Sequence, residues 1–302
     1  MKVWYARAIF DEKEKQAVRE CLDNFQLAPG EYTDRFEQEI ANIFDKQDGI
    51  MVNSGSSALE LAAEMLNIGA GDEVITAGSG FPTTILPFIR RGATAVFTDV
   101  DPLTLSPVEI EKHITPKTVA LVFAHIWGST LDMAQLRDIA DKYELPLIED
   151  SCDSLGATID GIPTGHWSDM SVTSFYPSHV ITAGGGGGML CVNRGRDRAL
   201  SLRDWGRSVI DEDNMDRFES NIDGIPYDAK FTFENAGFNL KAVEMQAAFG
   251  LAQLERLESW NTARRSNYRA LKKIVEKHGL EVIRPAALGA ESSWLAFPFL
   301  AP

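Results

Sequence analysis

The chain has 302 residues, of which 44% are hydrophobic, and this is enough to bury a large core and to form two domains. Acidic residues outnumber basic ones by 44 to 29, and the net charge of −15 disfavours binding to nucleic acid or to an anionic membrane surface. No apolar run is long enough to span a bilayer and the first residues lack the apolar core of a signal peptide, so we expect a cytoplasmic protein.

Short apolar runs alternate with segments of helical period in the first two thirds of the chain. Strands are predicted at 50–53, 72–77, 94–99, 119–124 and 145–149, and helices at 56–66 and 133–143. This alternation is typical of right-handed crossovers and of a mostly parallel sheet covered on both faces. Two later strands, at 170–175 and 189–192, are separated by too few residues for a crossover helix, so we expect that pair to be antiparallel.

The last third of the chain is predicted to be mainly helical, after a polar stretch without clear period at 208–231. Two helices are expected, one at 242–260 and one at 263–278. The segment 292–299 has the pattern of the first strand of a small domain, and a strand without partners is not stable, so we expect this end to be poorly supported. We therefore predict a large domain at 1–250, with an N-terminal arm at 1–35, and the start of a small, apparently truncated domain at 251–302.

The most informative motif is Ser-Phe-Tyr-Pro-Ser-His at 174–179, followed by five glycines at 184–188. It resembles the lysine-bearing segment of the DegT/DnrJ/EryC1/StrS sugar aminotransferases, which use pyridoxal phosphate (PLP), with His179 at the position of the lysine. An imidazole cannot form an imine with the cofactor aldehyde, but it can move protons near neutral pH. Within the family, this exchange resembles the NDP-4-keto-6-deoxyhexose 3-dehydratases.

A possible anion site lies at 53–57, where Asn-Ser-Gly-Ser-Ser joins a predicted strand to the start of a helix. Backbone N–H groups and the helix dipole favour an anion at such a place. Taken alone, the pattern fits an ordinary serine cap with a glycine turn equally well. The resemblance implies that Gly55, Ser56 and Ser57 bind the phosphate of the cofactor.

Asp150 follows the strand predicted at 145–149, so its carboxylate lies at the end of a strand where α/β proteins bind ligands. Without the resemblance, Asp150 would be read as a cap of the next turn. The resemblance implies that Asp150 pairs with the pyridine nitrogen of PLP and that Asp153 lies near the active site. It also implies that Phe81 stacks on the cofactor ring, although a role in the core would suit this side chain too.

Three further residues are candidates for the site. The resemblance implies that Ser174 contacts the phosphate or the ring, and that Asn239 reaches across a homodimer interface to the neighbouring phosphate. Taken alone, Asn239 is better explained as a helix cap. His125 ends the strand predicted at 119–124 and is a candidate to face the same crevice.

The resemblance implies an α/β fold of the PLP-dependent transferase type I, with a mostly parallel central sheet in a three-layer sandwich and an incomplete small C-terminal domain. It implies that glutamate converts PLP to pyridoxamine phosphate (PMP), which reacts with the 4-keto group of a nucleotide sugar. His179 then removes a proton and the 3-hydroxyl leaves. Such a reaction belongs to deoxysugar and lipopolysaccharide O-antigen biosynthesis, and the choice between GDP and CDP stays open.

Two features depart from the family pattern. Relatives carry Gly-Glu-Gly-Gly after the base, and Gly185 stands at the Glu position here. One dehydratase branch holds a [2Fe–2S] cluster on cysteines that follow the segment matching 203–207, whereas 208–231 contains no cysteine. The three cysteines of the chain, Cys21, Cys152 and Cys191, are too few for four thiolate ligands and fit neither a disulfide framework nor a zinc site. We expect neither a cluster nor another metal site.

Three other functions compete with the dehydratase. A sugar aminotransferase would need the missing lysine. A nicotinamide dehydrogenase would need Gly-x-Gly-x-x-Gly after the first strand, and the segment 53–57 lacks it. A family member that binds PLP non-covalently, or that is catalytically inert, is favoured by Gly185 and by the short C-terminus, and it stays open as the alternative.

Overall fold

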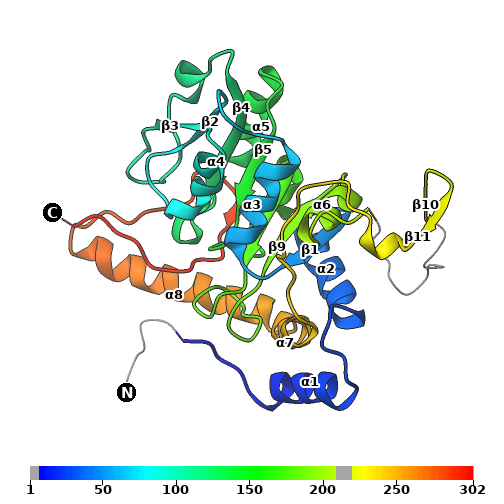
Figure 1. Cartoon of the computed structure of the whole chain (residues 1–302). Helices are drawn as coiled ribbons and strands as arrows, with labels where there is room; N and C mark the ends of the chain where they lie inside the picture. The colour runs from blue at the N-terminus through cyan, green and yellow to red at the C-terminus, as the bar shows by residue number, and fades with distance from the viewer. Residues whose placement is uncertain (1–6, 209–219, 302) are drawn as a thin grey trace.

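The computed structural model describes residues 7–208 and 220–301, and its centre is a seven-stranded sheet of order β1-β9-β8-β5-β4-β2-β3 (Figure 1). Its strands are β1 (Asp48–Val52), β2 (Glu73–Ala77), β3 (Thr94–Thr98), β4 (Thr118–Ala124), β5 (Leu147–Asp150), β8 (Met170–Ser174) and β9 (Gly188–Val192). Neighbouring strands are parallel except for the two pairs that β9 makes with β1 and β8. The predictions of a mostly parallel sheet and of an antiparallel final pair are confirmed.

Helices cover both faces of this sheet, because alternate strand residues are apolar on both sides. On one face, Ile50 and Val52 of β1 pack with α3 (Gly55–Met65), α4 (Leu86–Arg90) and α6 (Arg196–Arg203). On the other face, Met51 packs with α2 (Glu31–Ile43) and α7 (Glu244–Leu254), and strands β4 and β5 pack with α5 (Met133–Lys142). The result is the expected sandwich of three layers.

The boundary between the last two helices differs from the prediction. Instead of ending near residue 260, α7 ends at Leu254, and α8 runs from Leu257 to Lys277. At the turn between them, the Arg256 guanidinium pairs with Glu14 at 2.7 Å and with Asp11 at 3.2 Å, at the start of α1 (Glu12–Asp23). Local periodicity carries no signal of a contact between residues so far apart in the chain.

A buried carboxylate joins the N-terminal part of the chain to α7. Glu244 is fully buried and accepts hydrogen bonds from the backbone N–H groups of Gly30, Tyr32 and Thr33, at 2.8, 2.7 and 3.2 Å. These N–H groups stand at the start of α2, where a helix leaves donors without intrahelical acceptors. Glu244 therefore caps α2 from another helix and fixes the two helices against each other.

The C-terminal segment is not the strand predicted at 292–299. The segment instead follows β12 (Ala290–Glu291), which pairs with β6 (Thr158–Ile159), and β6 itself pairs with β7 (Ile162–Pro163). Within 292–299, Phe299 forms an isolated antiparallel bridge with Val282. After β12, the Trp294 ring stacks on Tyr268 of α8 with ring centroids 4.0 Å apart, and Trp294 is only 5% exposed. Figure 1 shows this red segment beside the orange α8. The expectation of a poorly supported end is therefore wrong for this segment, and the division into two domains stays a prediction.

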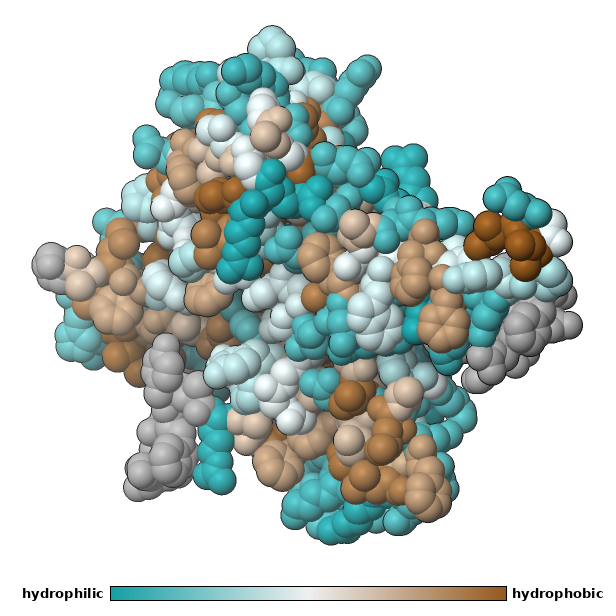
Figure 2. Space-filling view, viewed as in Figure 1, coloured by the Kyte–Doolittle hydropathy of each residue, from teal (hydrophilic) through white to brown (hydrophobic). Residues whose placement is uncertain are grey.

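The surface is mixed in character. Figure 2 shows hydrophilic side chains over much of the viewed face, with an apolar patch on the hairpin formed by β10 (Ser220–Ile222) and β11 (Ile225–Tyr227). Ile222 and Ile225 of this hairpin are 46% and 66% exposed. Within residues 7–208 and 220–301, no helix is both long enough and apolar enough to cross a membrane.

Candidate active site

The sheet brings three of the sequence motifs to one edge. Strands β1, β5 and β8 run in the same direction, so the residues that follow them share the carboxyl edge of the sheet. In the register of the strands, Val52 and Ser174 both lie beside Gly188, and Asp150 lies beside Val172. The segment 53–57, Asp150 and Ser174 therefore meet here, although they are far apart in the sequence.

The start of α3 forms a small cradle at this edge. Ser54 caps the helix, because its hydroxyl accepts the N–H of Ser57 at 3.1 Å, and the Ser57 hydroxyl donates to Asn53 at 2.6 Å. Ser56 is exposed. A side chain at Gly55 would place its Cβ 2.7 Å from the Cβ of Ser174, so only glycine allows this close approach. The serine cap and the predicted anion site are both compatible with this arrangement.

Asp150 ends β5 with its carboxylate held by two donors. The hydroxyl of Thr84 donates to one oxygen at 2.7 Å, and the N–H of Cys152 donates to the other at 3.1 Å. A carboxylate has about four acceptor sites, so Asp150 keeps capacity for a ligand. Burial, and then the charge of Asp150, raises the pKa of the Cys152 thiol well above its usual value, which disfavours the reactive thiolate form.

Phe81 stands next to the residues that hold Asp150. It immediately precedes the short helix η1 (Pro82–Thr84), and its carbonyl accepts the N–H of Thr84. The ring is 73% exposed, so it is not the core anchor that the sequence alone also allowed. An exposed aromatic ring beside a strand edge is suited to stacking on a flat ligand.

His179 lies against the carboxylate of Asp153. Its Nδ1 is 3.3 Å from Asp153 Oδ1, while the other oxygen of Asp153 accepts the N–H of Trp127 at 3.1 Å. Nδ1 is buried and forms no hydrogen bond with any of the described residues, although it lies close to Asp153. Catalytic hydrogen bonds are often poorly aligned before a ligand binds. With Nδ1 directed at a carboxylate, Nε2 is the ring nitrogen left to exchange a proton with a ligand.

A cavity of about 840 Å³ adjoins His179. Its walls come from the loop after β4, the loop after β8, α8 and two segments near the ends of the described chain, and they include Trp127, Ser178, His179, Arg264 and Leu295. Sequence reasoning identified only His179 among these residues. Ser178 belongs to the same hexapeptide, whereas Trp127, Arg264 and Leu295 carry no local motif, because they meet His179 only after the chain has folded.

The loop after β4 and the C-terminal segment meet through a glycine. A side chain at Gly128 would place its Cβ 2.8 Å from the backbone of Leu295, and the carbonyl of Trp127 accepts the N–H of Leu295 at 2.9 Å. Trp127 also binds Asp153, as described above. The C-terminal segment is therefore linked through two hydrogen bonds to the carboxylate that faces His179.

Asn239 lies close to the cradle, and its backbone forms an isolated antiparallel bridge with Asp204. The carbonyl of the next residue, Leu240, accepts the N–H of Asn53 at 2.8 Å, and Asn239 is exposed. The reading as a helix cap is wrong, because α7 begins five residues later with Val243 as its N-cap. Its reach into a second subunit stays a prediction, which sedimentation analysis of the oligomeric state can test.

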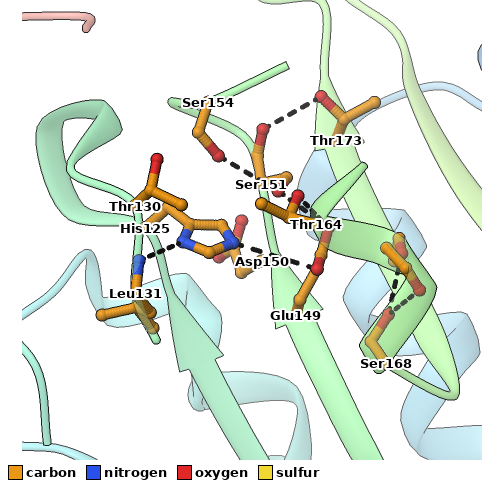
Figure 3. Close-up of polar contacts among 12 residues, drawn as sticks. His125, Thr130, Leu131, Glu149, Asp150, Ser151, Ser154, Thr164, Ser168 and Thr173 are labelled. Carbon is orange, nitrogen blue, oxygen red and sulfur yellow. Dashed lines mark hydrogen bonds and ion pairs between the residues drawn. The ribbon is translucent and has the colours of Figure 1, made fainter. Parts of the chain in front are cut away.

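His125 does not face the crevice, in contrast to the expectation. Its side chain is fully buried, its Nδ1 accepts the N–H of Leu131 at 3.1 Å, and its Nε2 lies 3.9 Å from Glu149 (Figure 3). Glu149 also accepts the hydroxyls of Ser151 and Thr164, at 3.0 and 3.1 Å. This buried network lies behind the end of β5 and holds the strand that presents Asp150.

Gly185, which the resemblance places where relatives carry glutamate, lies on an exposed loop. Its φ of 122° falls in a region that residues with side chains rarely adopt. No described atom lies within 4 Å of the place where its Cβ would be. The backbone of this loop therefore suits glycine, and the space beside it is open.

Known proteins are similar to this chain in sequence and in fold. The dTDP-4-dehydro-2,6-dideoxy-D-glucose 3-dehydratase of Saccharopolyspora spinosa is 37% identical over 308 residues, covering 96% of this chain and 67% of the relative. The solved E. coli GDP-4-keto-6-deoxy-D-mannose-3-dehydratase with bound hydrated PLP has a TM-score of 0.86 at 26% identity, covering 100% and 80%. The aminotransferase TlmJ from Streptoalloteichus hindustanus has a TM-score of 0.83 at 27% identity, covering 98% and 78%.

These likenesses confirm the expected PLP-dependent transferase fold of type I, and solved neighbours hold PLP or PMP, the cofactors expected from the sequence. They include both dehydratases and aminotransferases. The sequence profile of one family matches residues 8–302, which is nearly the whole chain. The chain belongs to the DegT/DnrJ/EryC1/StrS aminotransferase family.

Proposed function

We propose that this protein is a PLP/PMP-dependent 3-dehydratase that removes the 3-hydroxyl group of a nucleotide-linked 4-keto-6-deoxyhexose. The observation that carries the proposal is the place of His179 beside Asp153 and at the wall of a large cavity. The resemblance puts this residue at the position of the family's lysine. Histidine supplies a base without a covalent bond to the cofactor. Two of the similar proteins are named as 3-dehydratases, and these names support the proposed reaction. The similarity to the aminotransferase TlmJ does not distinguish dehydration from amino transfer.

The residues at the strand edge fit a flat cofactor that carries a phosphate. Gly55, Ser56 and Ser57 would hold the phosphate at the start of α3, where a side chain on Gly55 would fill the cradle. Asp150 would accept a hydrogen bond from the ring nitrogen, and the exposed Phe81 would stack on the ring. When bound, PLP supplies an electron sink, and its amine form supplies the group that reacts with a ketone.

His179 would accept and release a proton at Nε2, while Asp153, 3.3 Å from Nδ1, would orient the imidazole. A carboxylate on Nδ1 fixes the tautomer that leaves Nε2 as the acceptor. Ser174, which lies against Gly55, would complete the binding of the phosphate or the ring. We also propose that the protein is a homodimer, in which Asn239 of a second copy completes the site. Glutamate is the proposed amino donor.

The first test is the mode of PLP binding. We expect PLP to bind to the purified protein and to change its absorbance, but borohydride treatment should leave the intact mass unchanged, because His179 cannot be reduced onto the cofactor. The matched control is His179→Lys, which should gain the mass of a pyridoxyl group. A pyridoxyl adduct on any lysine of the unmodified protein would contradict the proposal.

The second test concerns the source of electrons. The stretch 208–231 contains no cysteine, so we expect anaerobically purified protein to hold no stoichiometric iron. Turnover should then proceed with glutamate alone, without a reductase. Iron analysis checks the first expectation, and parallel assays with glutamate or with NADH and a reductase check the second. Stoichiometric iron, or activity that requires the reductase, would overturn this part of the assignment.

The alternative is a family member that binds PLP non-covalently without turnover. The open loop at Gly185, where relatives carry glutamate, favours it. PLP binding with no release of a 3-deoxy sugar from either GDP- or CDP-linked substrates would support this alternative over the dehydratase.

A further inference from the structure

Arg264 on α8 is a largely buried cation without a described counter-charge. Its Nη1 is buried and has no hydrogen-bond partner among residues 7–208 and 220–301. Burial lowers the pKa of its guanidinium, and none of the described acids raises it again. An arginine stays charged at neutral pH, and a buried charge without a partner is unfavourable.

Neighbouring arginines show the usual solution to this problem. Arg265, the next residue, donates to the carbonyl of Ser292 at 3.3 Å and pairs with Glu258 at 3.3 Å and Glu291 at 3.4 Å. Arg256, at the start of the helix, pairs with Glu14 at 2.7 Å. Arg264 differs from these two arginines, because its Nη1 has no partner among the described residues. Its side chain lines the cavity instead.

Arg264 and His179 line the same two spaces. Both belong to the wall of the cavity of about 840 Å³, together with Trp127, Ser178 and Leu295. Both also line a smaller adjoining space of about 180 Å³. A molecule that enters this cavity can therefore meet the imidazole and the unmatched guanidinium together.

We propose that Arg264 binds an anionic oxygen group, a phosphate or a carboxylate, of the molecule whose reacting part lies at His179. A guanidinium presents its N–H donors in a fork that fits both groups. The inference rests on the proposed function, in which both ligands are anions. One is a nucleotide sugar with a diphosphate, and the other is an amino donor with two carboxylates.

Titration calorimetry with two simple probes can test this role. Inorganic pyrophosphate stands for the diphosphate, and glutarate stands for the dicarboxylate without its amine. We expect Arg264→Gln to weaken the binding of one probe by about 10- to 100-fold, the usual effect of losing a charge-assisted hydrogen bond. Arg264→Lys should retain part of the affinity. The matched control is Arg269→Gln, since Arg269 is exposed on the same helix.

The probe that loses affinity identifies the ligand. If pyrophosphate binding falls, Arg264 holds the nucleotide, and if glutarate binding falls, it holds the amino donor. The proposal is wrong if the unmodified protein, with or without PLP, binds neither probe, or if Arg264→Gln binds both as before.

Thermal unfolding gives an independent readout. Without a probe, Arg264→Gln should melt no lower than the unmodified protein, because the substitution removes a buried charge that has no described partner. The probe should raise the melting temperature of the unmodified protein but not of Arg264→Gln. A purely structural arginine would give the opposite result, a lower melting temperature with the probe effect retained.

The outcomes separate this inference from the proposed function. If Arg264 controls anion binding but no nucleotide sugar is dehydrated, the function fails and the anion site stands. If dehydration proceeds with an unchanged kcat/KM in Arg264→Gln, the anion site fails and the function stands.

Discussion

Replacing His179 by asparagine is expected to lower the turnover of a 4-keto-6-deoxy nucleotide sugar by about 10²–10⁴-fold, the usual contribution of a general base. Asparagine approximates the shape of the histidine side chain, but it cannot accept and return a proton near neutral pH. The side chain lies beside Asp153 at the wall of the cavity, so the substitution removes the base and leaves the residues at the strand edge in place. Release of the 3-deoxy sugar, measured at saturating substrate, checks this expectation.

PLP binding should largely survive in His179→Asn, because the proposed cofactor contacts come from the strand edge and not from His179. The matched control is His166→Asn, which removes an exposed histidine paired with Asp45 at 2.7 Å. That variant should keep its turnover. Turnover at the level of the unmodified protein in His179→Asn would refute the mechanism.

Asp150→Asn is expected to weaken PLP binding by about 10- to 100-fold. The carboxylate is 6% exposed, is held by Thr84 and Cys152, and in the proposed site it accepts a hydrogen bond from the protonated ring nitrogen. A hydrogen bond to a charged group contributes about 1.5–3 kcal/mol, and each 1.4 kcal/mol corresponds to a factor of ten. Absorbance titration with PLP measures the change.

Two variants serve as controls for Asp150→Asn. Thr84→Val removes one donor to the carboxylate but keeps its charge, so it should weaken PLP binding less than Asp150→Asn does. Asp141→Asn removes a carboxylate that is 68% exposed on α5, and it should bind PLP normally. Unchanged affinity in Asp150→Asn would remove Asp150 from the proposed site.

The strand edge could be predicted from the sequence because its signals are local. Apolar runs such as that of β1 record burial on both faces of a sheet, and the polar residues that follow them, such as Asp150, mark the ends of the strands. The hexapeptide that ends at His179 is likewise a local signal, because six consecutive residues are enough to show its resemblance to the family's lysine-bearing segment. These features needed no knowledge of which segments become neighbours.

Contacts between distant segments could not be predicted in this way. His125 stands near the end of a strand as Asp150 does, yet its side chain is buried beside Glu149 and does not line the cavity beside His179. The turn between α7 and α8 coincides with the pairing of Arg256 with Glu14, on a helix near the other end of the chain. Neither the burial of His125 nor the position of the helix boundary can be predicted from the hydrophobic pattern of nearby residues.

The sequence by itself determined the alternation of strands and helices, the motifs at the strand ends and the resemblance that places His179 at the family's lysine position. Each of these depends on side-chain chemistry and backbone preference over a few consecutive residues. Only the tertiary structure decided that the C-terminal segment packs on α8 and reaches Asp153 through Trp127, and that Arg264 shares a cavity with His179. Burial and the pairing of charges depend on which distant segments pack together, and a linear pattern does not contain that information.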